Sequence, residues 1–186
     1  QLESREMLAI MGPSGSGKTT FLKCLLGEII PNRMKISINH ENYLPAESPY
    51  RKTIAYVPQD DLLFENLSIW QNLYYCAKIR VPDLFNDKND ILLEQKIKHI
   101  LSIMGLWDKR HLKAGSVHQK TLSGGERKRL NIALELLSDP QIIILDEPTS
   151  GLSSKDSEKL LETLNDLKQI GKMIIATIHQ PNAELF

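Results

Sequence analysis

Apolar residues along this chain fall into two alternating patterns, which are short continuous runs and helical repeats. Each run is five or six residues long and is bounded by glycine, proline or polar residues, which predicts a buried strand. The runs cover residues 7–11, 53–57, 141–145 and 173–178, and residues 35–39 show a weaker alternation.

Between the runs, apolar residues recur every three or four positions, as they do on the buried face of a helix. This spacing covers residues 20–26, 69–79, 91–104, 124–137 and 154–167. Three of these helices have well-marked buried faces, formed by Ile69, Leu73, Cys76 and Ile79, by Leu130, Ala133, Leu134 and Leu137, and by Leu160, Leu161, Leu164 and Leu167.

Small polar residues mark where the helices begin, and glycines mark where they end. A serine hydroxyl accepts a hydrogen bond from a first-turn amide, and a glycine adopts the left-handed conformation after the last turn. The predicted N-caps are Ser68, Ser123 and either Ser153 or Ser154. Glu126 completes a capping box with Ser123. The predicted stops are Gly27, Gly105 and Gly171, and Pro140 follows the fourth helix.

Strands that alternate with helices predict an α/β domain with a mostly parallel sheet. The stretch between Gln59 and Gln141 carries helical repeats without a convincing strand, so we interpret it as a helical insertion. We therefore expect one domain over residues 1–186, with a core formed by residues 1–66 and 141–186 and a helical subdomain over about residues 67–140.

Composition narrows the class of protein. Lys plus Arg and Asp plus Glu both number 23, so the net charge of zero argues against a nucleic-acid or polybasic membrane surface. Cys24 and Cys76 lie in apolar helical patterns, which favours buried free thiols in a reducing compartment. The chain shows no signal peptide and no apolar run of the ~20 residues that span a bilayer, and without a starting Met we expect a piece of a longer protein.

A glycine-rich loop follows the first predicted strand and precedes the first predicted helix. It matches the phosphate-binding pattern G-x-x-x-x-G-K-[ST]. Its residues are Gly12, Pro13, Ser14, Gly15, Ser16, Gly17, Lys18, Thr19 and Thr20. The glycines let backbone amides approach phosphate oxygens at the positive end of a helix, Lys18 supplies a charge, and the Thr19 hydroxyl can ligate Mg²⁺. The sequence therefore predicts nucleotide binding here.

Polar residues follow three other predicted strands directly. They are Gln59, the pair Asp146 and Glu147, and His179. Because ligands of parallel sheets bind beyond the carboxyl ends of the strands, we expect these side chains to surround one nucleotide. Asp146 is the expected Mg²⁺ anchor, and Glu147 can orient or deprotonate an attacking water. Two acids after a strand can also simply cap a turn, and a lone glutamine or histidine is usually a satisfied polar group.

Two other polar stretches suggest metal chemistry only weakly. Residues 81–89 contain acidic positions, but the glycine of a calcium loop is missing, so a solvated loop is favoured. Residues 109–120 contain His111 and His118 without a ligand spacing, which favours a connector.

These motifs together resemble the nucleotide-binding domain of ABC transporters over nearly the whole chain. The matches are the loop at residues 12–20 (Walker A), Gln59 (Q-loop), the signature motif Leu122, Ser123, Gly124, Gly125 and Glu126, residues 142–147 (Walker B with its catalytic glutamate), and His179 (switch histidine). Residues 126–129, 146–152, 179–181 and the closing Leu185 and Phe186 are similar to the white, or ABCG, subfamily.

The resemblance implies a P-loop, RecA-like fold and a motor domain on the cytoplasmic face of a membrane, with ATP and Mg²⁺ as cofactors. Two such domains, identical or different, would pack head to tail, with each ATP between one Walker A loop and the Ser123, Gly124 and Gly125 of the partner. The γ-phosphate and the attacking water would be contacted by Glu147, His179 and Gln59. The Mg²⁺ ion would be bound by Thr19, Gln59 and Asp146. The helical insertion would contact the transporter's membrane domain.

Two other functions remain open at this point, and three departures from the family pattern bear on them. The alternatives are a soluble ABC ATPase of chromosome maintenance or translation, and a degenerate subunit that only binds ATP. Ser153 replaces the usual D-loop aspartate, which favours the second alternative, and Thr121 replaces a common glycine. The chain also lacks the upstream strands that usually carry an adenine-stacking aromatic residue, and the tail that completes the domain.

Overall fold

The structure of the protein is a computed structural model that describes residues 2–38, 41–42, 53–81, 90–115 and 121–179. Its main sheet contains the four strands predicted from the continuous apolar runs, in the order β1-β6-β5-β4 with every neighbouring pair parallel. The strands are β1 (Met7–Met11), β4 (Ile54–Val57), β5 (Ile142–Leu145) and β6 (Met173–Ile178). The prediction of an α/β fold with a parallel sheet is confirmed.

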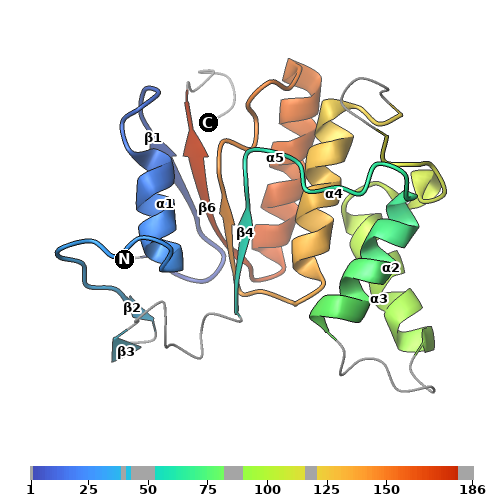
Figure 1. Cartoon of the computed structure of the whole chain (residues 1–186), viewed down its shortest axis with the longest axis horizontal. Coiled ribbons are helices and arrows are strands. Elements are labelled where there is room, and N and C mark those ends of the chain that lie inside the picture. The colour runs from blue at the N-terminus through green and yellow to red at the C-terminus, as the bar shows by residue number, and fades with distance from the viewer. Residues whose placement is uncertain (1, 39–40, 43–52, 82–89, 116–120, 180–186) are drawn as a thin grey trace.

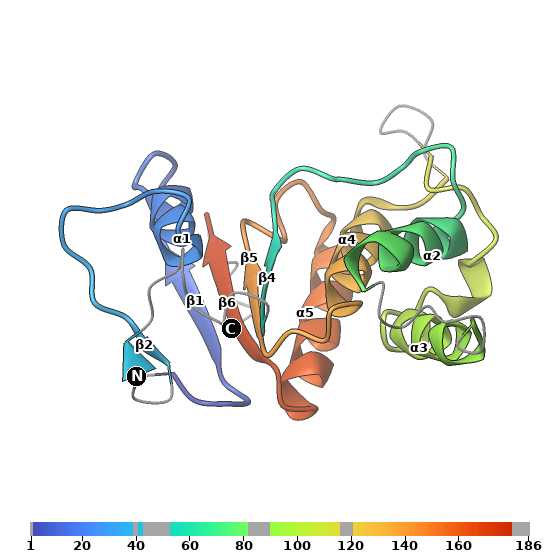
Figure 2. The same cartoon turned by 60° about the horizontal axis from the view of Figure 1, so that its bottom comes forward.

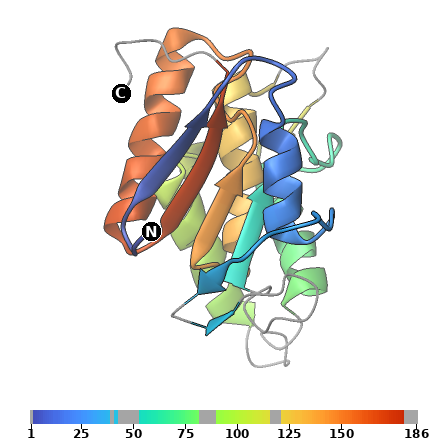
Figure 3. The same cartoon turned by 90° about the vertical axis from the view of Figure 1, so that its left-hand side faces the viewer.

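Helices cover both faces of this sheet. Helix α1 (Lys18–Leu26) lies on one face, and α4 (Gly124–Leu136) and α5 (Ser154–Gln169) lie on the other (Figures 2 and 3). The strands point their carboxyl ends toward one edge, and α1, α4 and α5 all begin at that edge (Figure 1). Residues far apart in the sequence therefore meet there.

Helices α2 (Ile69–Arg80) and α3 (Asp90–Ile103) lie beyond α4, away from the sheet (Figure 2). A short 3₁₀ turn, η3 (Trp107–Lys109), follows α3. Helix α4 packs against β4 and α5 on one side and against α2 and α3 on the other, so the core and the helical insertion share it. The boundaries of our proposed subdomains, with α4 in the insertion, stay a prediction.

Most predicted helix ends are found where the capping residues stand. Ser68 and Ser123 each form a complete capping box, and Ser153 rather than Ser154 caps α5. Gly27, Gly105 and Gly171 all take positive φ after their helices. Helix α1 begins two residues earlier than predicted, at Lys18, directly after the glycine loop.

Two predictions from the apolar pattern need correction. Ile79 does not belong to the buried face of α2, because its side chain is 79% exposed while Ile69, Leu73 and Ala77 are fully buried. Of the described residues 35–38, only β2 (Ser37–Ile38) is a strand, and it pairs antiparallel with β3 (Glu41–Asn42) in a separate two-stranded sheet.

Some of our expectations lie outside the described residues. They concern the loop at residues 82–89, the connector at 116–120 with His118, and residues 180–186. A search of the described residues for a helix long and apolar enough to cross a bilayer finds none. Cys24 is buried, Cys76 is partly buried, and both are free thiols.

Candidate active site

The loop between β1 and α1 presents an open helix N-terminus. Gly15 and Gly17 have φ values of 76° and 90°, which a side chain would strain. Gly17 is the N-cap of α1, and no side chain bonds to the first turn there. Because the first amides of a helix lack intrahelical partners, those of α1 face the loop as free donors at the positive end of the helix.

The side chain of Lys18, the first residue of α1, is almost fully buried and places its ammonium group against this loop. Its ammonium donates to the carbonyl oxygens of Gly12 at 2.8 Å and Pro13 at 3.1 Å. The same nitrogen lies 3.4 Å from Glu147 Oε1, in the loop after β5. The predicted phosphate-binding lysine and the predicted catalytic acid are therefore in direct contact.

Asp146 and Glu147 follow β5, and one hydroxyl on the neighbouring strand holds both. Thr177 Oγ1 donates to Asp146 Oδ1 at 2.6 Å and accepts the backbone N–H of Glu147 at 2.8 Å. Thr177 is fully buried and Asp146 is 2% exposed. Glu147 has a φ of 43°, a left-handed conformation that is uncommon for a residue with a side chain.

Thr177 is a residue that our sequence reasoning missed. The available signal was a hydroxyl near the carboxyl end of an otherwise apolar strand, two residues before His179. That strand, β6, pairs with β5, where Leu145 lies opposite Ala176. The next residues along the two strands are Asp146 and Thr177, so strand pairing alone brings the hydroxyl to the carboxylate.

Gln59 joins the same group from the loop after β4. Its side-chain amide donates to Glu147 Oε2 at 3.3 Å. Tyr56, on β4, places its hydroxyl 3.5 Å from Asp146 Oδ2, which is the outer limit of a hydrogen bond. Burial, with the nearby charge of Asp146, raises the pKa of Tyr56 to about 12. The start of α1, the loop after β4 and the strands β4 and β6 therefore each bring a side chain to the two carboxylates.

Three other predicted site residues lie at this edge without joining the group. Thr19 and Thr20 are exposed on the first turn of α1. His179 is exposed and follows β6 directly. Among the described residues, no hydrogen bond or ion pair links any of the three to Lys18 or to Glu147.

The signature residues form a second cluster, at the start of α4. The Ser123 hydroxyl accepts the Glu126 N–H at 3.2 Å, and Glu126 accepts the Ser123 N–H at 2.9 Å. Lys109 pairs with Glu126 at 2.6 Å. Burial by itself would raise the pKa of Glu126, but Lys109 and the Ser123 amide outweigh it, so the pKa lies below its usual value.

One carboxylate joins this cluster to the start of α5. Asp156 accepts hydrogen bonds from the hydroxyls of Ser123 at 3.0 Å and Ser153 at 3.2 Å. A Cβ on Gly125 would come within 2.5 Å of Asp156 Oδ1, so only glycine fits there. Within the described residues, no hydrogen bond connects the signature motif directly to the loop at residues 12–20.

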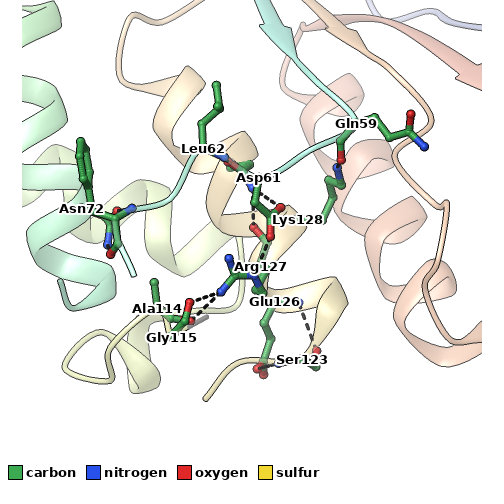
Figure 4. Close-up of polar contacts among 12 residues, drawn as sticks. Gln59, Asp61, Leu62, Asn72, Ala114, Gly115, Ser123, Glu126, Arg127 and Lys128 are labelled. Atoms are coloured by element: carbon green, nitrogen blue, oxygen red, sulfur yellow. Dashed lines mark hydrogen bonds and ion pairs between the residues drawn. The ribbon is translucent and has the colours of Figure 1, made fainter. Parts of the chain in front are cut away.

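A series of polar contacts connects the signature helix to the segment after Gln59 (Figure 4). Lys128 donates to the carbonyls of Pro58 and Gln59, and Arg127 and Asn131 bond to Asp61. These α4 side chains are each 5–6% exposed. Burial lowers the pKa of Lys128, and the nearby aspartates oppose that shift.

The oxygen donors at the strand edge fit a magnesium ion held jointly with phosphate. In the described part of the chain, no three His, Cys, Asp or Glu side chains gather closely enough to hold a metal by themselves. Asp146, the Thr19 hydroxyl and the Gln59 amide are hard donors from different loops. Mg²⁺ typically takes one or two protein ligands and completes its shell with water and phosphate oxygens, so this donor set suits it.

Comparison with known proteins shows that the chain is similar to ABC transporters. The family model described as ABC transporter matches residues 1–150. The chain is 41% identical over 182 residues to ABC transporter G family member 26 of Arabidopsis thaliana, covering 97% of this chain and 26% of that protein. It is 40% identical over 185 residues to the ABC-type transporter claG of Penicillium crustosum, covering 100% of this chain and 24% of that protein. The chain thus spans about a quarter of the length of these relatives.

Proposed function

Because the chain belongs to the ABC transporter family, as an ATP-binding domain of the G type, we propose that it hydrolyses MgATP to drive transport by a longer membrane protein. The observation that carries the proposal is the convergence of Lys18, Gln59, Asp146 and Glu147 at one edge of the sheet. A phosphate-binding lysine in contact with a carboxylate that can serve as a base suits phosphoryl transfer to water.

The loop and Lys18 hold the triphosphate in this proposal. The free first-turn amides of α1 donate to phosphate oxygens, and the Lys18 ammonium exchanges its carbonyl partners for the β- and γ-phosphates. A bound magnesium ion would be held by Thr19 and Asp146, with Gln59 as a further ligand. When bound, Mg²⁺ neutralises the charge that develops on the phosphate oxygens.

Glu147 acts on the attacking water. Its carboxylate accepts a proton from the water as the water oxygen bonds to the γ-phosphorus. The bond from that phosphorus to the β–γ bridging oxygen breaks and ADP leaves, while Gln59 and His179 orient the water and the phosphate. The Thr177 hydroxyl fixes the backbone of Glu147 and one oxygen of Asp146, so that the two acids keep their relative positions. Orientation of this kind is the main contribution that a protein makes to phosphoryl transfer.

The signature motif acts on the ATP of a second domain. Ser123, Gly124 and Gly125 lie at a helix N-terminus, which favours an anion. No hydrogen bond or ion pair among the described residues joins this motif to the phosphate loop, which supports a role between two domains. The partner is a second ATP-binding domain, identical or homologous, and the transporter's membrane domain completes the assembly.

The test is Glu147→Gln in the full-length protein, measured beside the wild type. We expect hydrolysis to fall by at least a hundredfold, because the amide cannot accept the proton. ATP binding should stay within about threefold, since the Lys18 loop is intact. The exposed Glu158→Gln on α5 is the control and should keep full activity. Steady turnover by the Glu147→Gln protein would remove the assignment of the base.

A catalytically degenerate subunit is the second candidate, and Ser153 is the observation that favours it. Ser153 caps α5 and bonds to Asp156, so no carboxylate stands at the usual D-loop position itself. The same measurements separate the two functions. A wild-type protein that binds MgATP saturably and does not hydrolyse it would support the degenerate subunit.

A further inference from the structure

The segment that carries Gln59 is attached along its length to the signature helix. It leaves β4 at Val57 and passes α4 before it reaches α2 (Figure 4). Four of its residues, Pro58, Gln59, Asp61 and Leu62, bond to side chains of α4. We call residues 58–62 the glutamine segment.

Lys128 makes the contact nearest to the active site. Its ammonium donates to the carbonyl oxygen of Gln59 at 2.7 Å and to that of Pro58 at 3.2 Å. The residue is 5% exposed. A buried ammonium is costly unless its donors are bonded, so these two bonds attach both carbonyls to α4.

A second set of contacts extends the attachment by one turn. Arg127 pairs with Asp61 at 2.6 Å, and it also donates to the carbonyl oxygens of Ala114 and Gly115. Asn131 donates to Asp61 at 2.7 Å and accepts the backbone N–H of Leu62 at 3.1 Å. These bonds, together with those of Lys128, join the glutamine segment to the first turns of α4.

The same helix begins at the signature serine. Ser123 is the N-cap of α4, less than two turns before Lys128. At the other end, the side chain of Gln59 reaches Glu147. A continuous path of short contacts therefore runs from the catalytic glutamate, through Gln59 and Lys128, to the serine that faces a second domain.

We propose that Lys128 is a positioning residue that fixes the main chain of Gln59 to the signature helix, and so ties the chain's own ATP site to the signature motif that serves its partner's. This inference rests on the proposed ATPase function. Lys128 itself touches neither substrate nor metal; it acts through Gln59.

The experiment is a double-mutant cycle in the full-length protein, with Lys128→Met, Gln59→Ala and the double variant. Methionine keeps most of the length of the side chain and removes the donors. We expect Lys128→Met to lower kcat at least tenfold with the Kd for MgATP within threefold of the wild type. In the Gln59→Ala background, the same substitution should lower kcat by less than twofold, because the side chain that Lys128 positions is gone.

Two further variants sharpen the cycle. Lys128→Arg keeps the charge and the N–H donors and should recover kcat to within about threefold of the wild type. Lys159→Met is the matched control, because the Lys159 side chain is 57% exposed and pairs with Glu162 on the surface of α5. It should change neither kcat nor the Kd.

The outcomes separate the inference from the function on which it rests. A kcat for Lys128→Met within twofold of the wild type, or an equal loss in both backgrounds, would overturn the role of Lys128, since a merely structural residue would lose the same factor in each. A wild-type protein that fails to bind MgATP would instead overturn the proposed function. If Lys128→Met shows no cooperative melting transition, Lys128→Gln replaces it in the same cycle and is judged by the same two results.

Discussion

Thr177→Val tests whether one buried hydroxyl organises the two acids of the site. Valine has the same shape as threonine, so the substitution removes two hydrogen bonds without opening a cavity. The bonds are those from Thr177 Oγ1 to Asp146 Oδ1, at 2.6 Å, and from the Glu147 N–H to Thr177 Oγ1, at 2.8 Å. Asp146, which is 2% exposed, and the partly buried Glu147 then each lose one of these bonds.

The magnitude follows from these two bonds. A hydrogen bond to a charged group contributes about 1.5–3 kcal/mol, and an unsatisfied buried donor costs about 1–3 kcal/mol. Because Glu147 is only partly buried, we take the low end, about 1 kcal/mol, for its N–H and expect a total loss of about 2.5–4 kcal/mol in folding stability. Misplacing a catalytic group by about 1 Å costs on the order of a hundredfold in rate, so kcat should fall by about 10–100-fold.

The assay compares kcat, the Kd for MgATP and the apparent Tm for three variants of the full-length protein. Thr177→Ser keeps the hydroxyl and should retain kcat within about threefold. Thr163→Val removes another buried hydroxyl, which donates to the Lys159 carbonyl at 2.9 Å on α5, far along the chain from the acids. It should lower Tm and leave kcat unchanged. Equal kcat values for Thr177→Val and Thr177→Ser would refute the reasoning.

Two other substitutions examine the signature cluster. Gly125→Ala would bring a Cβ to 2.7 Å from Asp156 Cβ, so it should lower folding stability by about 1–3 kcal/mol through overpacking. Gly124→Ala should cost less, because its Cβ would meet the end of the flexible Leu152 side chain. Equilibrium denaturation of both variants measures the two losses of stability. The folded pKa of Glu126 is lowered by Lys109 and the Ser123 amide, so its contribution to stability is present above its ordinary pKa of 4.5 and is lost as the pH falls through the folded value. Glu126→Gln should therefore remove part of the loss of stability below about pH 4.5, and parallel pH-dependent melting curves of the variant and wild type would contradict this.

The strands were predictable because their burial requires continuous apolar runs in the sequence. A strand covered on both faces is apolar throughout, and β6 was predicted to its observed bounds, Met173–Ile178. Helix starts were predictable for a local reason, since a serine and the amide that it caps are three residues apart. The convergence of Gln59 with Glu147 needed one further step, that parallel strands end at the same edge, and their side chains meet at 3.3 Å.

The failures trace to contacts that local patterns do not record. Ile79 continues the apolar repeat of α2, but it lies at the rim of a cavity of about 260 Å³ lined by the exposed side chains of Leu62 and Phe64, where no element of the described chain covers it. Arg127 and Lys128, whose burial the sequence analysis did not predict, are 6% and 5% exposed. Their position held a signal: cations near a helix N-terminus oppose its dipole, so such residues need acceptors elsewhere.

The replacement at Ser153 illustrates why a motif has to be judged together with its surroundings. Taken alone, a serine in place of the usual D-loop aspartate removes a carboxylate from the start of α5. One turn later, however, Asp156 supplies a carboxylate that accepts hydrogen bonds from Ser153 and from Ser123. Because a negative charge in a first turn complements the helix dipole, the start of α5 keeps the electrostatics that an aspartate would give it. The same carboxylate now bonds to the signature serine, so communication between the two motifs can run through this chain's own contacts, and Ser153 by itself is weak support for a degenerate subunit.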